Sequence, residues 1–206
     1  MNEFLNKNEL QNLIEKEDFD EIISRIEKIG RDNNLLWLVV PREGDLNILY
    51  QENFERPSFC RMFIDLLYGQ GQSHERLKRY VNYVKSKNLN NKWTFPTYFL
   101  FMSHPDSEIF VKPKTIKWFL NFIDESIEFS LQPTPETYST IKQVASNLKE
   151  MLNAYQPKDM VDIQSLIWVA YNVEKSTYIS SGKKEEFSTL FEEFTRTYAK
   201  TPKGDT

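Results

Sequence analysis

Residues 134–152 read TPETYSTIKQVASNLKEML, and this stretch decides the fold class. Thr134 suits the N-cap of a helix, Pro135 suits the first helical position, and Glu136 lies in the first turn, where the helix dipole favours negative charge. Apolar side chains then recur at helical spacing: Tyr138, Ile141, Val144, Ala145, Leu148, Met151 and Leu152. The pattern predicts a long amphipathic helix that runs to about Tyr155 and buries one face.

The same spacing recurs through most of the chain, with capping residues and prolines between the apolar stripes. It predicts helices around residues 10–14, 19–29, 58–68, 74–87, 94–102, 113–123 and 160–173, and a last one that carries Phe187, Leu190, Phe191 and Phe194. Glycine is scarce, at 6 of 206 residues, which disfavours a turn-rich all-β architecture. We therefore expect an all-α fold, a single compact multi-helix domain of about eight helices in an orthogonal or irregular bundle.

Several helix ends can be predicted from capping residues. Asp18 or Asp20 suits the N-cap of the helix at 19–29, and Gly30 is placed to end it. Ser73 is a good N-cap for the helix at 74–87. The helix at 160–173 is apolar almost all round after Gln164, which predicts that it is the central, buried helix.

Two segments bear on the organisation of the chain. Residues 35–40 read LLWLVV and allow either a short buried strand or a short helix that stops before Pro41. We expect residues 1–173 to form the helical core domain, and residues 174–206 to comprise a polar linker at 176–182, an amphipathic helix and a frayed tail.

The composition favours a cytoplasmic protein. The single cysteine, Cys60, cannot form an internal disulfide, and its apolar neighbours predict a buried structural thiol. The first residues are polar and acidic, unlike a secretory leader, and no apolar run approaches the roughly 18 residues of a membrane span.

Positive charge is concentrated between His74 and Lys117, a segment that we call the basic segment. Nine cations and three anions give it a charge of +6, whereas the whole chain carries −4, so the remainder carries −10. The cations are Arg76, Lys78, Arg79, Lys85, Lys87, Lys92, Lys112, Lys114 and Lys117, and the anions are Glu75, Asp106 and Glu108. Such segregation is typical of a surface for phosphate or for an acidic partner, and equally of one solvated helix face.

The basic segment contains the candidate binding residues. Lys112, Lys114, Lys117 and Trp118 surround a helix start at Pro113, where free backbone N–H groups can accept a phosphate or carboxylate. Arg76 and Arg79 on the preceding basic helix can add charge if the two helix starts meet in space. Neighbouring aromatic side chains could stack on bases, namely Trp93, Phe95, Tyr98 and Trp118. The alternative interpretation is that these aromatics form the core and the lysines are merely solvated.

Catalytic motifs are missing from the sequence. The chain has only two histidines, His74 and His104, and it contains no HExxH, no paired CxxC, no phosphate-binding glycine loop and no GxSxG. Asp159 and Asp162 are the best carboxylates for catalysis, but Asp159 is explained as the N-cap of the helix at 160–173 and Asp162 as a first-turn residue that the helix dipole favours. We therefore expect no enzyme activity, no cofactor and no metal site.

Three segments together resemble a known family. The first runs from Leu66 to Tyr80, the second reads FPTYFLF at 95–101 and continues through FVKPKT at 110–115, and the third reads PKDMVDIQSLIWV at 157–169. Their order is similar to the helical region that accompanies the AAA+ motor in McrB-type, methylcytosine-specific restriction proteins of bacteria. The resemblance covers roughly residues 59–170 and is most specific in DMVDIQSLIW. It implies an accessory helical module without the motor, since no Walker A motif is present.

Two functions follow as expectations. The first is a non-enzymatic helical module that contacts DNA or an acidic partner in a bacterial or phage defence setting, through Arg76, Arg79, Lys112, Lys114, Lys117 and Trp118. The alternative is a protein–protein interaction module, a regulator, subunit or inhibitor of a defence complex, with no nucleic-acid contact. The motivation for the alternative is the acidic remainder of the chain and the apolar stripe of residues 187–194.

Overall fold

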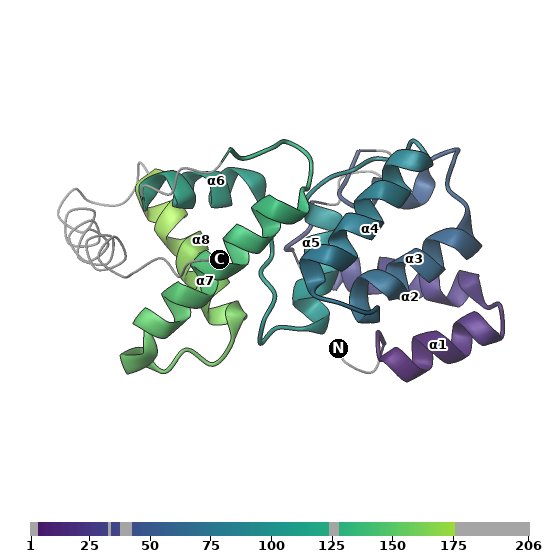
Figure 1. Cartoon of the computed structure of the whole chain (residues 1–206), viewed down its shortest axis with the longest axis horizontal. Coiled ribbons are helices and arrows are strands. Elements are labelled where there is room, and N and C mark those ends of the chain that lie inside the picture. The colour runs from purple at the N-terminus through teal and green to yellow at the C-terminus, as the bar shows by residue number, and fades with distance from the viewer. Residues whose placement is uncertain (1–3, 33, 38–42, 124–127, 176–206) are drawn as a thin grey trace.

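The computed structural model describes residues 4–32, 34–37, 43–123 and 128–175, and in this part of the chain it consists of helices without strands (Figure 1). The all-α prediction is confirmed, and eight α-helices and two 3-10 turns lie within the described ranges. The elements are α1 (Lys7–Glu15), α2 (Phe19–Arg31), η1 (Asn47–Tyr50), α3 (Arg56–Tyr68), α4 (Ser73–Ser86), α5 (Thr94–Ser103), α6 (Pro113–Phe122), α7 (Pro135–Met151), η2 (Asn153–Tyr155) and α8 (Met160–Lys175). None of the described helices is long and apolar enough to span a membrane.

The helices form two groups that meet along α4 and α7. In Figure 1, α1 to α5 occupy the right-hand half, and α6 to α8 occupy the left-hand half. Helix α3 packs against α1, α2, α4 and α5, whereas α8 packs against α6 and α7. The contact of α4 with α7 joins the two groups, so one hydrophobic core runs through both.

The central helix is α5, because seven of its 10 residues are buried. Its aromatic side chains meet those of α3: the ring centroids of Phe63 and Phe99 are 5.1 Å apart, and those of Phe59 and Phe95 are 5.8 Å apart, both edge to face. Edge-to-face pairs add about 0.5–1.5 kcal/mol each to the stabilisation from buried area. The aromatic residues of the basic segment therefore build the core that holds α3 and α5 together.

The prediction that 160–173 is the central helix is wrong. Helix α8 buries Ile163, Ile167 and Ala170 on one face, but Trp168 and Val169 on the other face are 50% and 43% exposed. An apolar sequence on both faces does not by itself make a helix central, and the close contacts of α8 among the described elements are with α6 and α7.

Capping followed the prediction at some helix ends and not at others. The Asp18 carboxylate accepts from the backbone N–H of Glu21 at 3.2 Å, and the Thr134 hydroxyl accepts from that of Thr137 at 3.3 Å, as expected for N-caps. Gly30, in contrast, lies inside α2, where a side chain would collide with Leu46, since an added Cβ would come within 2.9 Å of its Cδ1.

The start of α4 lies one residue earlier than predicted. Gln72 is the N-cap and Ser73 the first helical residue, and the Glu75 carboxylate accepts from the N–H of Gln72 at 2.7 Å. The hydroxyl of Ser73 is buried and used elsewhere, as described below. Helix α7 ends at Met151, earlier than expected, and the chain continues as the 3-10 turn η2.

Two predicted segments fall wholly or partly outside the described residues. Within 35–40 only Leu35, Leu36 and Trp37 are described; they form neither strand nor helix, and Leu36 is buried. The linker, the amphipathic helix and the tail predicted for residues 176–206 lie outside the described part of the chain.

A buried carboxylate connects the two groups of helices. Glu108, in the segment between α5 and α6, accepts from the Lys142 ammonium at 2.6 Å and from the Tyr138 hydroxyl at 2.8 Å. Lys142 also donates to the Ser73 hydroxyl at 2.6 Å, so α4, α7 and the segment before α6 share one network. Burial, and then the Glu108 charge, raise the pKa of Tyr138 well above its usual value, so its hydroxyl stays protonated and keeps donating.

We predict that Lys142→Met lowers the free energy of unfolding by about 3 kcal/mol, because it leaves a buried carboxylate without its cation. Urea unfolding measures the change. A Glu108→Leu/Lys142→Met double variant removes both charges and should recover part of the loss. A single variant as stable as the wild type would show that the network does not hold the two groups together.

Burial also protects the only thiol of the chain. Cys60 is fully buried on α3, which confirms its predicted structural role, and desolvation raises its pKa to about 12. We predict that a thiol reagent labels Cys60 only as fast as the protein unfolds, even near pH 9. An exposed control, Ser86→Cys on α4, should label at once under the same conditions. Fast labelling of native wild-type protein would contradict the packing of α3.

Candidate functional site

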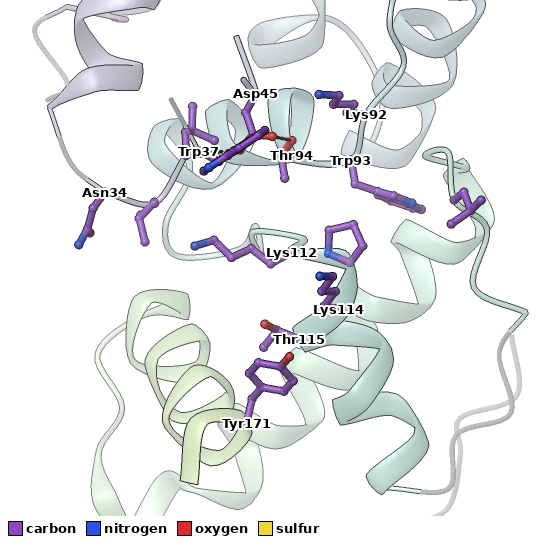
Figure 2. A pocket seen from close by; sticks show the side chains of 14 residues that line it. Asn34, Trp37, Asp45, Lys92, Trp93, Thr94, Lys112, Lys114, Thr115 and Tyr171 are labelled. Atoms are coloured by element: carbon purple, nitrogen blue, oxygen red, sulfur yellow. Dashed lines mark hydrogen bonds between the residues drawn. The ribbon is translucent and has the colours of Figure 1, made fainter. Parts of the chain in front are cut away.

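The candidate site is a groove where the starts of α5 and α6 face the segment that follows α2 (Figure 2). Its volume is about 610 Å³, within the range of about 300–1,000 Å³ that is usual for ligand pockets. The lining residues that carry polar or aromatic groups are Asn34, Trp37, Asp45, Lys92, Trp93, Thr94, Lys112, Lys114, Thr115 and Tyr171. The groove thus combines three lysines of the basic segment with aromatic side chains.

A buried hydroxyl fixes the two helix starts relative to each other. Thr97, on the first turn of α5, donates to the carbonyl oxygen of Trp93 at 2.6 Å and accepts from the N–H of Val111 at 3.1 Å. Val111 precedes Lys112, the N-cap of α6. The start of α6 is therefore tied to the start of α5 by one side chain, which sets the width of the groove.

Asp45 positions the wall opposite α6. Its carboxylate accepts from the backbone N–H of Trp37 at 2.7 Å and from the hydroxyl of Thr94 at 2.8 Å, and its own N–H donates to the carbonyl oxygen of Trp37 at 2.8 Å. These bonds hold the backbone of Trp37 while its indole remains 56% exposed. Figure 2 shows the indole above the side chain of Lys112. An exposed aromatic ring on a fixed backbone is a platform for stacking.

Lys112 is the most unusual cation of the groove. Its side chain is half-buried, and desolvation lowers its pKa, with a smaller opposing contribution from Asp45. Among the residues that the structure describes, no carboxylate lies within ion-pair distance of it, and its ammonium lies 5.6 Å from the ring centroid of Phe110. A partly desolvated ammonium that has no ion-pair partner among the described residues is favourably placed for an anionic ligand.

The first turn of α6 adds donors to the same place. No side chain caps this turn, so the N–H groups of Lys114 and Thr115 at its second and third positions are not used by a cap. The partial positive charge of a helix start favours anions, and the exposed Lys114 adds a full charge beside it. Tyr171 of α8 lies below this turn and closes the groove on that side (Figure 2).

The six predicted site residues do not form one cluster. Lys112 and Lys114 line the groove, Lys117 is exposed one turn further along α6, and Trp118 packs on Phe122 and Tyr171, with centroid distances of 5.3 and 5.7 Å. The second helix start, that of α4, contributes no residue to the groove.

The two predicted arginines lie on α4, and both bond to partners within the protein, on α3 and in the turn before α4. Arg76 donates to the carbonyl oxygens of Leu66 and Gly71, both at 2.9 Å. Arg79 forms a bidentate ion pair with Asp65, at 2.6 and 3.0 Å, and its pKa is raised mainly by this bond. Both guanidinium groups therefore hold α4 and its preceding turn against α3.

The prediction that Trp93, Phe95 and Tyr98 could stack on bases is wrong, because all three are buried. The exposed aromatic residue of the groove that sequence reasoning missed is Trp37. It lies far from the basic segment in sequence, and no local pattern separates it from the apolar residues beside it. The tertiary structure shows that its side chain lines the groove (Figure 2), while Asp45 holds its backbone.

Catalytic chemistry gains no support from the described residues. They contain no cluster of three or more histidine, cysteine or acidic side chains that could hold a metal ion. The ring of His104 bonds to the carbonyl oxygen of Leu67 at 2.7 Å and packs edge to face on Tyr68. Asp159 and Asp162 accept from the backbone N–H groups of Val161 and Lys158, as expected for the start of a helix.

Comparisons of the chain with protein-family models, with curated proteins and with solved structures found no match. The groove is therefore interpreted from its own geometry.

We predict that Lys112→Met raises the free energy of unfolding at neutral pH, by less than about 1 kcal/mol. The native state then no longer holds a desolvated charge. Because the folded pKa of Lys112 is lowered, the difference should shrink as pH rises through that pKa and the native ammonium loses its proton. Urea unfolding at two pH values tests this, with the exposed Lys114→Met as the matched control that leaves stability within about 0.5 kcal/mol. A loss of stability in Lys112→Met would mean that its ammonium already has a partner.

Proposed function

We propose that the protein is a non-enzymatic nucleic-acid-binding module, and that the groove between α5 and α6 binds single-stranded DNA. The observation that carries the proposal is the half-buried side chain of Lys112, which lacks a carboxylate partner among the described residues and lines the same groove as the exposed indole of Trp37. A nucleotide offers the two complementary groups, an anionic phosphate and a flat base.

In this proposal each side of the groove binds a different part of the nucleotide. A backbone phosphate would be bound by Lys112, by Lys114 and by the N–H groups of the first turn of α6. The base would lie on the indole of Trp37, across the groove from α6 (Figure 2). Lys92 contributes less, because its ammonium already donates to the carbonyl oxygens of Glu43 and Gly44, at 3.2 and 3.3 Å.

A concave site favours a single strand over a duplex. A recess of this size admits one unpaired nucleotide, whereas the bases of a duplex are stacked inside the helix and cannot reach Trp37. The net charge of −4 opposes a polyanion at long range, so we expect moderate affinity with a strong dependence on salt.

We predict that the protein binds a short fluorescent oligothymidine in low salt and that Trp37→Ala weakens binding about 10-fold, because base stacking contributes about 1–3 kcal/mol. A Lys112→Ala/Lys114→Ala variant should lower the salt dependence of log K by about 0.7 per lost phosphate contact. Fluorescence anisotropy at about 50 and about 200 mM salt gives both quantities.

The matched control is Lys78→Ala/Lys85→Ala, which removes the same charge from two exposed lysines of the basic segment that lie on α4, outside the groove. It should bind like the wild type. Equal weakening by both double variants would reduce the proposal to a non-specific charge effect. Absence of binding by the wild type in low salt would refute it, and equal affinity for a duplex would refute the preference for single strands.

A bacterial or phage defence setting belongs to the same proposal and rests on the resemblance of residues 59–170 to the helical region of McrB-type proteins. The alternative function, a protein–protein interaction module, requires an apolar surface that a partner can cover. Helix α8 carries such a surface, because Val161, Trp168 and Val169 are exposed on it.

A further inference from the structure

A buried hydroxyl group lines the groove without a partner. Thr115, on the first turn of α6, is only 4% exposed, and it is one of the residues that form the groove (Figure 2). Within the described part of the chain its hydroxyl neither donates nor accepts a hydrogen bond. The two other buried threonines of this part, Thr97 and Thr137, both use theirs, with the Trp93 carbonyl oxygen and the Thr134 hydroxyl. Because buried polar groups are normally bonded, the Thr115 hydroxyl is available to a ligand.

This hydroxyl belongs to a set of donors at the start of α6. The backbone N–H groups of Lys114 and Thr115 occupy the second and third positions of the helix, where no side chain caps them. The side chains of Lys112 and Lys114 line the same end of the groove (Figure 2). All of these donors come from residues 112–115, so one anionic group bound at the helix start is within reach of each of them.

The charge of the groove matches a dianion better than a single charge. Three lysines and one aspartate line it, so its lining carries +2, and both Asp45 oxygens are already bonded on the opposite wall. The start of α6 adds a partial positive charge of about 0.5. A phosphate inside a strand carries one negative charge, whereas a terminal phosphate carries about −1.5 to −2 at pH 7 and has three free oxygens that accept hydrogen bonds.

The position of Thr115 also favours the end of a strand. Its low exposure places the hydroxyl at the bottom of the groove, and Tyr171 closes the groove beside it (Figure 2). A phosphate inside a strand is esterified on two sides, so both neighbouring nucleotides would have to pass these walls. A terminal phosphate is esterified on one side and enters the recess end first.

We propose that the groove selects a single strand whose end carries a phosphate, and that the Thr115 hydroxyl donates a hydrogen bond to this terminal phosphate. The inference rests on the proposed function, because it names the preferred ligand of the same groove. The base of the terminal nucleotide would stack on Trp37, and the strand would leave the groove on the side away from Tyr171. A 5′-phosphate and a 3′-phosphate share this chemistry, and the experiment distinguishes them.

The test compares one internally labelled oligothymidine in three forms: with a 5′-phosphate, with a 3′-phosphate, and with neither. Fluorescence anisotropy in low salt should show that one phosphorylated form binds about 10-fold more tightly than the unphosphorylated form, since a hydrogen bond to a charged group contributes about that factor. Thr115→Val removes the hydroxyl and keeps the shape of the side chain. It should reduce the ratio of the two affinities to about 2-fold, the part that is due to charge alone.

Two further variants isolate the hydroxyl. Thr115→Ser keeps it and should retain most of the preference for the phosphorylated strand. The matched control is Thr140→Val, which makes the same change on α7, outside the groove, and should bind all three strands like the wild type. Far-UV circular dichroism reports whether each variant remains folded.

The outcomes separate this inference from the proposed function. If no form of the strand binds, both fail together, whereas equal binding of all three forms by the wild type overturns the terminal-phosphate proposal alone. A preference that survives Thr115→Val would overturn the assigned part of the hydroxyl. A phosphotyrosine peptide offers the same phosphate with an aromatic ring, so tighter binding of such a peptide than of any strand would overturn the proposal in favour of a protein partner.

Discussion

The buried carboxylate of Glu108 is the interaction on which the rest of the structure depends. It lies between the two groups of helices and receives hydrogen bonds from Lys142 and Tyr138 of α7, while Lys142 also reaches Ser73 of α4. A buried charge is tolerated only when every partner is in place, so this network fixes the relative positions of α4, α7 and the segment before α6. Apolar contacts alone would permit several arrangements of similar free energy.

The position of the α6 start, and with it the shape of the groove, depends on that network, because the chain runs directly from Glu108 to α6. The chain leaves Glu108, is bound at Val111 by the hydroxyl of Thr97, and enters α6 at Pro113. Lys112 lies between these fixed points, where its ammonium loses water without gaining a carboxylate among the described residues. Ion pairs within the protein satisfy Arg79 and Lys87 elsewhere in the basic segment, so its cations divide into those with a carboxylate partner and those, such as Lys112, without one among the described residues.

Helix α8 presents two different surfaces. Tyr171 lines the groove from one side of this helix, and Trp168 and Val169 are exposed on another. Among the described elements, α8 packs closely on α6 and α7, so these contacts fix the position of Tyr171 in the groove.

The sequence by itself determined the helical class, most helix boundaries and the placement of Lys112 and Lys114 at a helix start, because periodicity and capping act over a few residues. It did not determine which apolar helix is central, since α5 and α8 are both apolar and only packing buries α5 on all sides. Nor did it distinguish Arg79, which pairs with Asp65, from Lys112, which has no such pair in the described residues. The backbone of Trp37 is held at the groove by Asp45, which also accepts a hydrogen bond from Thr94, a residue far from it in sequence. Such contacts are decided by the tertiary structure, because the free energy of a charge or an aromatic ring depends on neighbours that local sequence does not specify.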